Sequence, residues 1–177
     1  MTITYRDMDY QSPADCALLA DWYNAPSTKH LYSRFTNAED FARSFTPAYF
    51  KRVGEAPKPG GPSRDLMVLS NGTPIGQAKF ETDTPKLITK AANTAWIALI
   101  VGDHRLRRSG MGTRITKHLE QQAAKSGAQR IEIGVFEYNH RALSFFTGLG
   151  YEEFKRLPDR AWWDDRLWHD VRLRKTL

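Results

Sequence analysis

The chain has 177 residues, 41% of them hydrophobic, and a formal net charge of +6. This length and composition predict one globular domain over residues 1–177 with a core of ordinary size. They exclude a membrane-spanning protein, because no apolar run approaches the length of a bilayer span, and the first residues lack the apolar segment of a secretory leader.

Two helices are expected near the N-terminus, after a first strand over residues 1–8. Ser12 is a favourable cap residue and Pro13 suits the first helical position, so the first helix should begin there. The sequence Thr36-Asn37-Ala38-Glu39 has the pattern of a capping box. It predicts a second helix, which Pro47 breaks or restarts.

A β-hairpin is expected next. Asn71-Gly72 is a strong turn signal between an apolar run, 66–69, and a second strand, 74–80. The single cysteine, Cys16, allows no internal disulfide and no cysteine metal cluster, and it falls in the apolar part of the first helix. We expect it to be a buried packing residue. Together these features predict a cytoplasmic protein.

The most informative stretch is 94–151. An apolar run from Ala95 to Val101 predicts a buried strand, and the glycine-containing turn 107–112 follows it. Apolar residues then recur at helical spacing as far as Gly127, a plausible C-terminal stop; they are Ile115, Leu119 and Ala123.

Further elements complete the chain. Ile131, Ile133 and Val135 alternate with other residues, which predicts a strand, and Asn139 can cap the next helix. Two more strands are expected over 151–157 and 168–173. Three tryptophans lie in or beside these strands and either pack an edge hairpin or line an acceptor site; they are Trp162, Trp163 and Trp168.

The turn at 107–112 has the order Arg-x-x-Gly-x-Gly and opens a helix. Unpaired amides at a helix start, with the positive end of the helix dipole, bind phosphate groups, and glycine allows a ligand to approach the backbone closely. The turn therefore predicts a pyrophosphate site. It is neither a nucleoside-triphosphate P-loop nor a Rossmann start, because it lacks Gly-Lys-Ser/Thr and the Gly-x-Gly-x-x-Gly order.

Positive charge gathers around this turn. A polyanionic ligand accounts for part of the basic excess without nucleic acid. The cationic residues concerned are Arg105, Arg107, Arg108, Arg114 and Lys117.

Two linked motifs resemble those of the GNAT superfamily, the Gcn5-related N-acetyltransferases. The turn at 107–112 resembles motif A, and residues 137–151, with Asn139-x-x-Ala142 at a helix start, resemble motif B. The resemblance is closest to the bacterial branch that acetylates protein N-termini, polyamines or aminoglycosides. It implies an α/β (α+β) fold with a mixed, mostly antiparallel sheet of six to seven strands. About four helices flank this sheet, which is splayed at its central parallel strands.

The resemblance also implies the activity and the cofactor site. The activity is direct transfer of acetyl from acetyl-CoA to a primary amine in a ternary complex. Ile100 and Gly102 would pair with the pantetheine arm, the Ile100 N–H would stabilise the oxyanion, and Asn139 and Phe146 would contact the cofactor. Main-chain amides of seven consecutive residues would bind the pyrophosphate; they are Arg107, Arg108, Ser109, Gly110, Met111, Gly112 and Thr113.

The residues for proton transfer depart from the family pattern. Phe146 stands where many relatives carry a tyrosine acid, and Trp96 stands where some carry a glutamate. Glu132 is the best base candidate, and the alternative is a carboxylate paired with Arg141 or Arg172. Three further candidates stay open: Glu81, Asp103 and His104. The histidines show no metal-ligand spacing, so no metal is expected.

The acceptor is expected to be a small-molecule or peptide amine, without nucleic acid or membrane, and a homodimer is compatible with the resemblance. Two alternatives differ in class. The absence of a tyrosine at 146 and a glutamate at 96 fits a non-catalytic acyl-CoA-binding or regulatory module. The positive charge fits an acetyltransferase directed at aminoacyl-tRNA.

Overall fold

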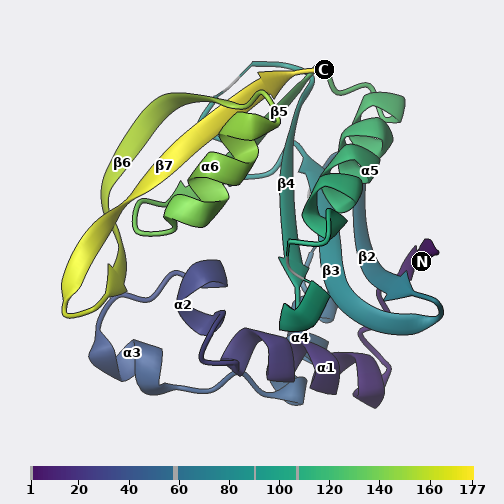
Figure 1. Cartoon of the computed structure of the whole chain (residues 1–177), viewed down its shortest axis with the longest axis vertical. Coiled ribbons are helices and arrows are strands. Elements are labelled where there is room, and N and C mark those ends of the chain that lie inside the picture. The colour runs from purple at the N-terminus through teal and green to yellow at the C-terminus, as the bar shows by residue number, and fades with distance from the viewer. Residues whose placement is uncertain (1, 58–59, 90, 107) are drawn as a thin grey trace.

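The structure is a computed structural model that describes residues 2–57, 60–89, 91–106 and 108–177, with the backbone alone for His104. Seven strands form one sheet in the order β1-β2-β3-β4-β5-β7-β6 (Figure 1). Only β4 and β5 run parallel. The strands are β1 (Ile3–Asp7), β2 (Ser63–Ser70), β3 (Thr73–Thr82), β4 (Thr94–Val101), β5 (Arg130–Phe136), β6 (Glu152–Trp163) and β7 (Arg166–Thr176).

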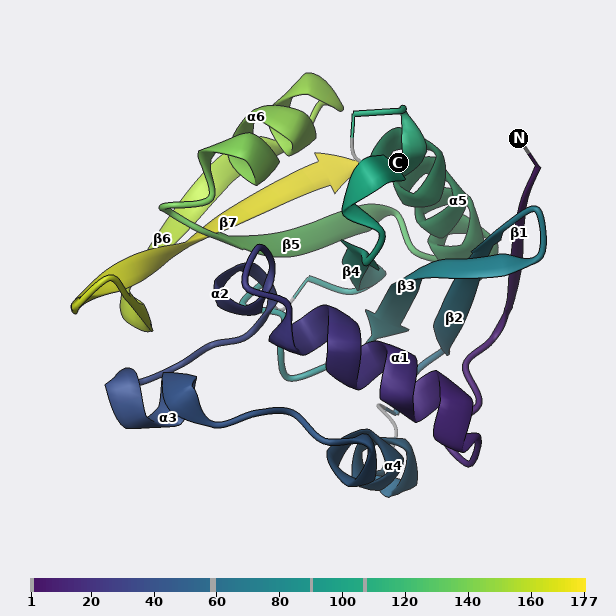
Figure 2. The same ribbon diagram turned by 60° about the horizontal axis from the view of Figure 1, so that its bottom comes forward.

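Helices cover both faces of the sheet. Figure 2 shows α1 to α4 on one side of the strands and α5 and α6 on the other. Within the described residues there are six α-helices and a 3-10 turn, η1 (His104–Leu106). The helices are α1 (Pro13–Asn24), α2 (Lys29–Tyr32), α3 (Ala38–Ala42), α4 (Pro47–Glu55), α5 (Met111–Lys125) and α6 (His140–Gly148).

The expected fold class is confirmed, including the mostly antiparallel sheet and its splayed parallel strands. Pro47 restarts the chain as α4 instead of merely ending the preceding helix. The helix predicted from the capping box is short, because α3 ends at Ala42 and the cap residue is Asn37. Among the residues described here, no helix has both the length and the apolar character needed to cross a lipid bilayer.

The two C-terminal strands are longer than the sequence predicted. They pair with each other from Glu152 to Trp163, and their turn contains Asp164 and Asp165, both with positive φ. The register shifts between Leu157 and Ala161, around Pro158. Proline interrupts a ladder, which is why the sequence signal stopped early although the pairing resumes.

Side-chain alternation divides the sheet into two chemically different faces. The face under α5 and α6 is apolar, and its buried residues Ile97 and Ile133 share one core cluster with Ile115 of α5. The opposite face carries polar side chains, which include Gln77 on β3 and Glu132 on β5. A smaller apolar cluster of α1 and α4, around Leu19 and Phe50, lies on that side.

The pairing between β4 and β5 stops early. It covers Thr94 to Trp96 against Arg130 to Glu132, whereas the strands continue to Val101 and Phe136. Beyond that point the two central strands diverge, and their facing edges have no ladder between them. The turn before α5 follows β4 and the start of α6 follows β5, so both motifs lie beside this gap.

Helix α1 is tied to β1 by an ion pair. The two terminal guanidinium nitrogens of Arg6 donate to the Asp15 carboxylate at 2.6 and 2.7 Å, and Asp15 is 5% exposed. The hydrogen bonds from Arg6 lower the pKa of Asp15 despite its burial. Because α1 covers the polar face of the sheet, this pair helps to hold the cover in place.

We predict that Asp15→Asn lowers the free energy of unfolding by about 1–2 kcal/mol at pH 7, the loss of a charged hydrogen-bonded pair with one partly exposed partner. A carboxyl group with a lowered folded-state pKa stabilises the fold in full above its unfolded pKa, about 4. That contribution is lost as the pH falls through the folded-state pKa. Urea unfolding should therefore show a difference at pH 7 that shrinks below pH 4.

Asp7→Asn is the matched control for this prediction. Asp7 also pairs with an arginine, Arg64 at 2.8 Å, but its side chain is 74% exposed. Its loss should change the unfolding free energy by less than about 1 kcal/mol. Equal effects of the two variants would contradict the anchoring role of Asp15.

Candidate active site

The turn before α5 has the geometry of an anion site. Gly110 is the N-cap of α5 with φ 78° and ψ 1°, a left-handed conformation that glycine adopts without strain. It supplies no side chain to cap the helix, and the first amides of a helix have no partner within it. The positive end of the helix dipole lies at the same place.

The structure brings several of the predicted cradle residues to one cavity. Arg108, Gly110, Gly112 and Thr113 line one large cavity of about 1330 Å³. Ser109 donates its hydroxyl to the Leu106 carbonyl at 2.6 Å. The Met111 side chain is buried in the core, so only its main chain is available to a ligand. Arg107 lies outside the described residues.

The same cavity follows the gap between β4 and β5. It is lined by residues 96–101 of β4 and 133–136 of β5, and then by Asn139 and Phe146 at α6. The Asn139 side chain accepts a hydrogen bond from the Ala142 N–H at 3.2 Å and so caps α6. Capping and cofactor contact are therefore compatible at Asn139.

The structure corrects the main-chain assignment on β4. The Gly102 N–H donates to the Ile75 carbonyl at 2.9 Å, and Ile100 is paired with Gln77 on the same strand, β3. Peptide groups of a strand alternate between its two edges, so Ile100 and Gly102 both face β3. Neither amide is available to a ligand in the gap.

Leu99 and Val101 present their amides to the open edge instead. The same alternation directs their N–H groups toward β5, beyond the point where the β4–β5 pairing ends. The sequence shows that amides alternate between the two edges of β4, but not which of them face β3. Two amides that face β3, those of Ile100 and Gly102, were therefore assigned from the sequence to the open edge. Gly102 has a packing role: a Cβ there would overlap the indole of Trp22 on α1.

Glu132 is buried in a salt bridge and not on the cavity surface. Its side chain is 1% exposed, and Arg172 lies 3.2 Å away. Its two carboxylate oxygens accept the N–H groups of Ile88 and Thr89 at 3.0 and 3.2 Å. This geometry favours the ion-pair alternative, with Arg172 rather than Arg141 as partner, over a role as general base.

Two of the other acid–base candidates, Glu81 and Asp103, also have hydrogen-bond or ion-pair partners. Glu81 accepts hydrogen bonds from Thr84 and Lys86 and pairs with Lys79 at 2.6 Å. Asp103 pairs with Arg105 at 2.8 Å. The side chain of His104 lies outside the described residues.

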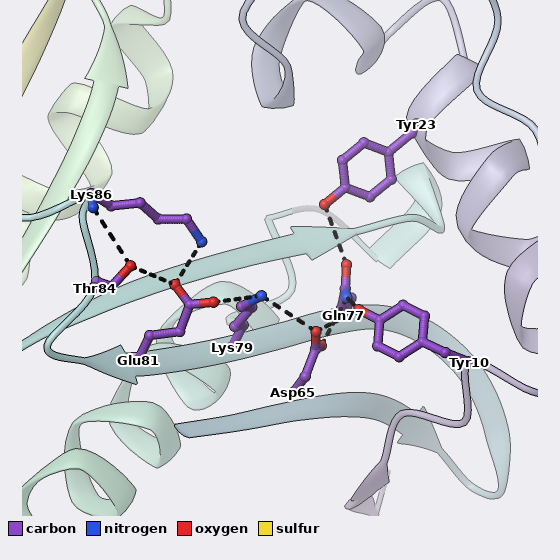
Figure 3. A network of polar contacts seen from close by, with 8 residues as sticks. All are labelled: Tyr10, Tyr23, Asp65, Gln77, Lys79, Glu81, Thr84 and Lys86. Carbon is purple, nitrogen blue, oxygen red and sulfur yellow. Dashed lines mark hydrogen bonds and ion pairs between the residues drawn. The ribbon is translucent and has the colours of Figure 1, made fainter. Parts of the chain in front are cut away.

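On the polar face of the sheet, residues of α1 and α4 also line the cavity, and we call this part of it the chamber. A hydrogen-bonded network forms part of its wall (Figure 3). The Tyr10 hydroxyl donates to Asp65 at 2.5 Å, the Gln77 amide donates to Asp65 at 2.8 Å, and the Tyr23 hydroxyl donates to Gln77 at 3.2 Å. Lys79 then joins Asp65 to Glu81.

The two phenols and the lysine of this network keep their protons at neutral pH. Burial, followed by the nearby Asp65 carboxylate, raises the pKa of Tyr10, and burial also raises the pKa of Tyr23. Burial opposes the charge of Lys79, but Asp65 and Glu81 outweigh it and raise the pKa of Lys79. Both phenols therefore stay protonated as donors, and this wall of the cavity is polar.

The C-terminal tryptophans pack with one another and do not line the cavity. Trp163 stacks on His30 with ring centroids 4.2 Å apart, and the Trp168 indole donates to the Trp163 carbonyl at 2.8 Å. The packing alternative therefore describes them. Within the described part of the chain, no group of three or more His, Cys, Asp or Glu side chains could hold a metal ion.

A sequence model described as the Acetyltransferase (GNAT) family matches residues 19–151, three quarters of the chain. The chain belongs to the GNAT family of acetyltransferases. This confirms the family resemblance seen in the two sequence motifs. No curated protein matches the sequence of this GNAT chain.

Solved structures share the GNAT fold at low sequence identity. A candidate phosphinothricin N-acetyltransferase is 18% identical with a TM-score of 0.76, over 99% of each chain. The candidate acetyltransferase yncA from Salmonella typhimurium, solved with its cofactor acetyl-CoA, is 19% identical with a TM-score of 0.72, over 100% of this chain and 95% of that one. The aminoglycoside acetyltransferase AAC(6')-Ib, in complex with coenzyme A, is 16% identical with a TM-score of 0.67, over 99% and 95%.

We predict that Glu132→Gln acts first on local structure. The amide cannot accept from two N–H groups and an arginine as the carboxylate does, so the segment around Ile88 should loosen. Removing one member of a buried ion pair costs about 3 kcal/mol. Hydrogen exchange should be faster at the Ile88 and Thr89 amides, and urea unfolding should give the loss of stability.

Glu120→Gln is a matched control on the apolar face. Glu120 accepts from the Tyr151 hydroxyl at 2.9 Å and pairs with Lys175 at 3.0 Å. This variant should lose stability without a local effect at Ile88 and Thr89. Unchanged exchange at these amides in Glu132→Gln would sink the assignment.

Proposed function

We propose that this GNAT-family protein is an N-acetyltransferase that moves the acetyl group of acetyl-CoA directly to a primary amine in a ternary complex. One observation carries the proposal: a single cavity joins the phosphate-type turn before α5, the β4–β5 gap and the polar chamber. Such a cavity suits a ligand with a diphosphate at one end and a thioester at the other. The Salmonella neighbour, solved with acetyl-CoA, supports this choice of ligand.

In this proposal the cofactor is held mostly by main-chain groups. The amides at the start of α5 bind the pyrophosphate, and the Arg108 side chain, on the cavity surface, adds charge. Leu99 and Val101 take the place of Ile100 and Gly102 as partners of the pantetheine arm. Of these two residues on the open edge of β4, Leu99 lies nearer to the end of the β4–β5 pairing. Its N–H is therefore the proposed donor to the oxyanion.

The chemistry requires a neutral amine beside the thioester carbonyl. The new C–N bond gives a tetrahedral oxyanion, and its collapse breaks the C–S bond and releases coenzyme A. Phe146 offers no proton to the leaving sulfur. Thiols have a pKa of about 8.5, so a thiolate leaves readily and can take its proton from the amide nitrogen or from water.

The acceptor is a primary amine of a small molecule or a peptide that enters through the polar chamber. The chamber is lined by aromatic side chains of α1, α2 and α4, Tyr23 and Phe50 among them, and by charged residues of the sheet. Nucleic acid is not expected as a partner. The cytoplasmic location and the homodimer stay predictions.

Gly110→Asp should weaken binding of acetyl-CoA at least about tenfold, because it places a carboxylate where the pyrophosphate would lie. Gly127→Asp, at the other end of α5, is the matched control. Gly110 and Gly127 both have positive φ, and a Cβ on either meets no atom within 4 Å. Aspartate tolerates this conformation, so both variants carry similar strain.

Isothermal titration calorimetry with acetyl-CoA measures both variants. No heat with folded wild-type protein, or equal weakening in both variants, would contradict the site. Release of free thiol with a panel of amines then tests catalysis. Binding without turnover would favour the non-catalytic module, and binding of tRNA at low salt would favour the RNA-directed enzyme.

A further inference from the structure

Three carboxylates line the cavity, and they differ in their partners. Asp40 is half-buried and accepts from the Thr36 N–H at 3.0 Å. Asp65 is held by the network of the chamber wall. Asp170 on β7 is 5% exposed, and its Oδ1 is a buried oxygen that no donor reaches. A buried acceptor without a partner is costly, and one in a ligand cavity suggests that the ligand supplies the donor.

Asp170 lies at the beginning of the β4–β5 gap. A Cβ on Gly134 would stand 2.7 Å from Asp170 Oδ1 and 2.9 Å from Cη2 of Trp96. Gly134 is two residues beyond Glu132, the last β5 residue paired with β4. Because Gly134 has no side chain, the Asp170 carboxylate has space beside β5 at the point where β4 and β5 diverge.

The other oxygen of the same carboxylate is fixed. Arg172 Nε and Nη2 lie 3.1 and 3.0 Å from Asp170 Oδ2. Arg172 also donates to the Lys86 carbonyl at 2.8 Å and to Glu132 at 3.2 Å. The guanidinium therefore positions Asp170 through Oδ2 and leaves Oδ1 without a hydrogen bond.

The charges around Asp170 come from several elements. Burial raises the pKa of Asp170, and three cations oppose that rise: Arg172 on β7, Arg34 between α2 and α3, and Arg160 on β6. Glu132 on β5 faces the other side of Arg172. Asp170 is thus a stronger base than an exposed aspartate.

We propose that Asp170 is the general base that accepts the proton of the attacking amine, with Arg172 as its positioning residue. The inference rests on the proposed acetyl transfer. The acceptor arrives as an ammonium, moves the Trp96 edge aside and donates one proton to Oδ1. The neutral amine attacks the thioester carbon, the C–N bond forms and the C–S bond breaks. The sulfur takes a second proton from nitrogen, and Asp170 returns its own proton to water.

The sequence alone does not single out Asp170 as a catalytic candidate. Nothing local distinguishes it from its neighbours, because its role depends on Gly134 and Trp96, which lie on two other strands. The alternation Asp-x-Arg at 170–172 is a weak signal for a same-face pair in the last strand.

Asp170→Asn tests the assignment with two probe acceptors, an aliphatic amine and an alkoxyamine. The aliphatic amine is protonated at pH 7, whereas the alkoxyamine is already neutral and needs no base. We expect kcat/KM for the aliphatic amine to fall about 100-fold or more, a typical general-base contribution. The alkoxyamine rate and the Kd for acetyl-CoA should change little. Equal loss with both amines, or no loss with the aliphatic one, overturns the proposal.

Glu132→Gln separates the two carboxylates that share Arg172. After correction for the fraction of folded protein, Glu132→Gln should keep the wild-type ratio of kcat/KM for the aliphatic amine to kcat/KM for the alkoxyamine, whereas Asp170→Asn should lower it. If Glu132→Gln alone lowers that ratio, Glu132 is the base and the proposal fails.

The wild-type protein gives a second reading that requires no variant. If Asp170 accepts the proton, kcat/KM for the aliphatic amine is level across neutral pH and falls only at acid pH as Asp170 protonates. Without a base it falls about tenfold for each pH unit below the amine pKa. The tenfold slope would overturn the proposal. A folded wild-type protein that binds acetyl-CoA but acetylates neither probe contradicts the proposed function itself, a result distinct from loss confined to Asp170→Asn.

Discussion

The site depends on the early end of pairing between β4 and β5. Two parallel strands that separate after Trp96 and Glu132 leave main-chain groups facing each other without a ladder. Unpaired backbone N–H and C=O groups at such an edge require hydrogen-bond partners. An extended ligand that pairs with the edge as an added strand would supply them. The phosphate-type turn follows one of these strands and the α6 N-terminus follows the other. One interruption in the sheet therefore aligns both motifs along a single cavity.

Alternation of side chains lets the same sheet serve two purposes. One face packs α5 and α6 with apolar residues and fixes the positions of the strands. The other face carries charges that would be costly to bury alone and that are stabilised in networks. Asp65, Lys79 and Glu81 form one such network, and Glu132, Arg172 and Asp170 form the second. The gap passes between these two groups, so a reacting amine would meet preorganised charges.

Comparison of sequence with structure shows where local patterns are sufficient. The Asn71-Gly72 hairpin, the Gly110 turn and the Asn139 cap were all predicted at the observed residues. Each depends on conformational preferences of a few adjacent residues. The amides of Ile100 and Gly102 were assigned to the wrong edge of β4, because that edge is set by the register with Ile75 and Gln77 on β3. Register is a non-local property that residue spacing does not encode.

The sequence by itself determined the order of the elements and the phosphate-type turn, since these follow from short-range propensity and spacing, and its two motifs carry the resemblance to the GNAT family. Only the tertiary structure decided which carboxylate is paired and which has an unpartnered oxygen. The sequence favoured Glu132 as the base and did not single out Asp170, yet Arg172 and two loop amides engage Glu132, while a glycine on the neighbouring strand leaves space beside Asp170. Hydrogen-bond partners from distant segments set that difference, and they exist only once the chain has folded.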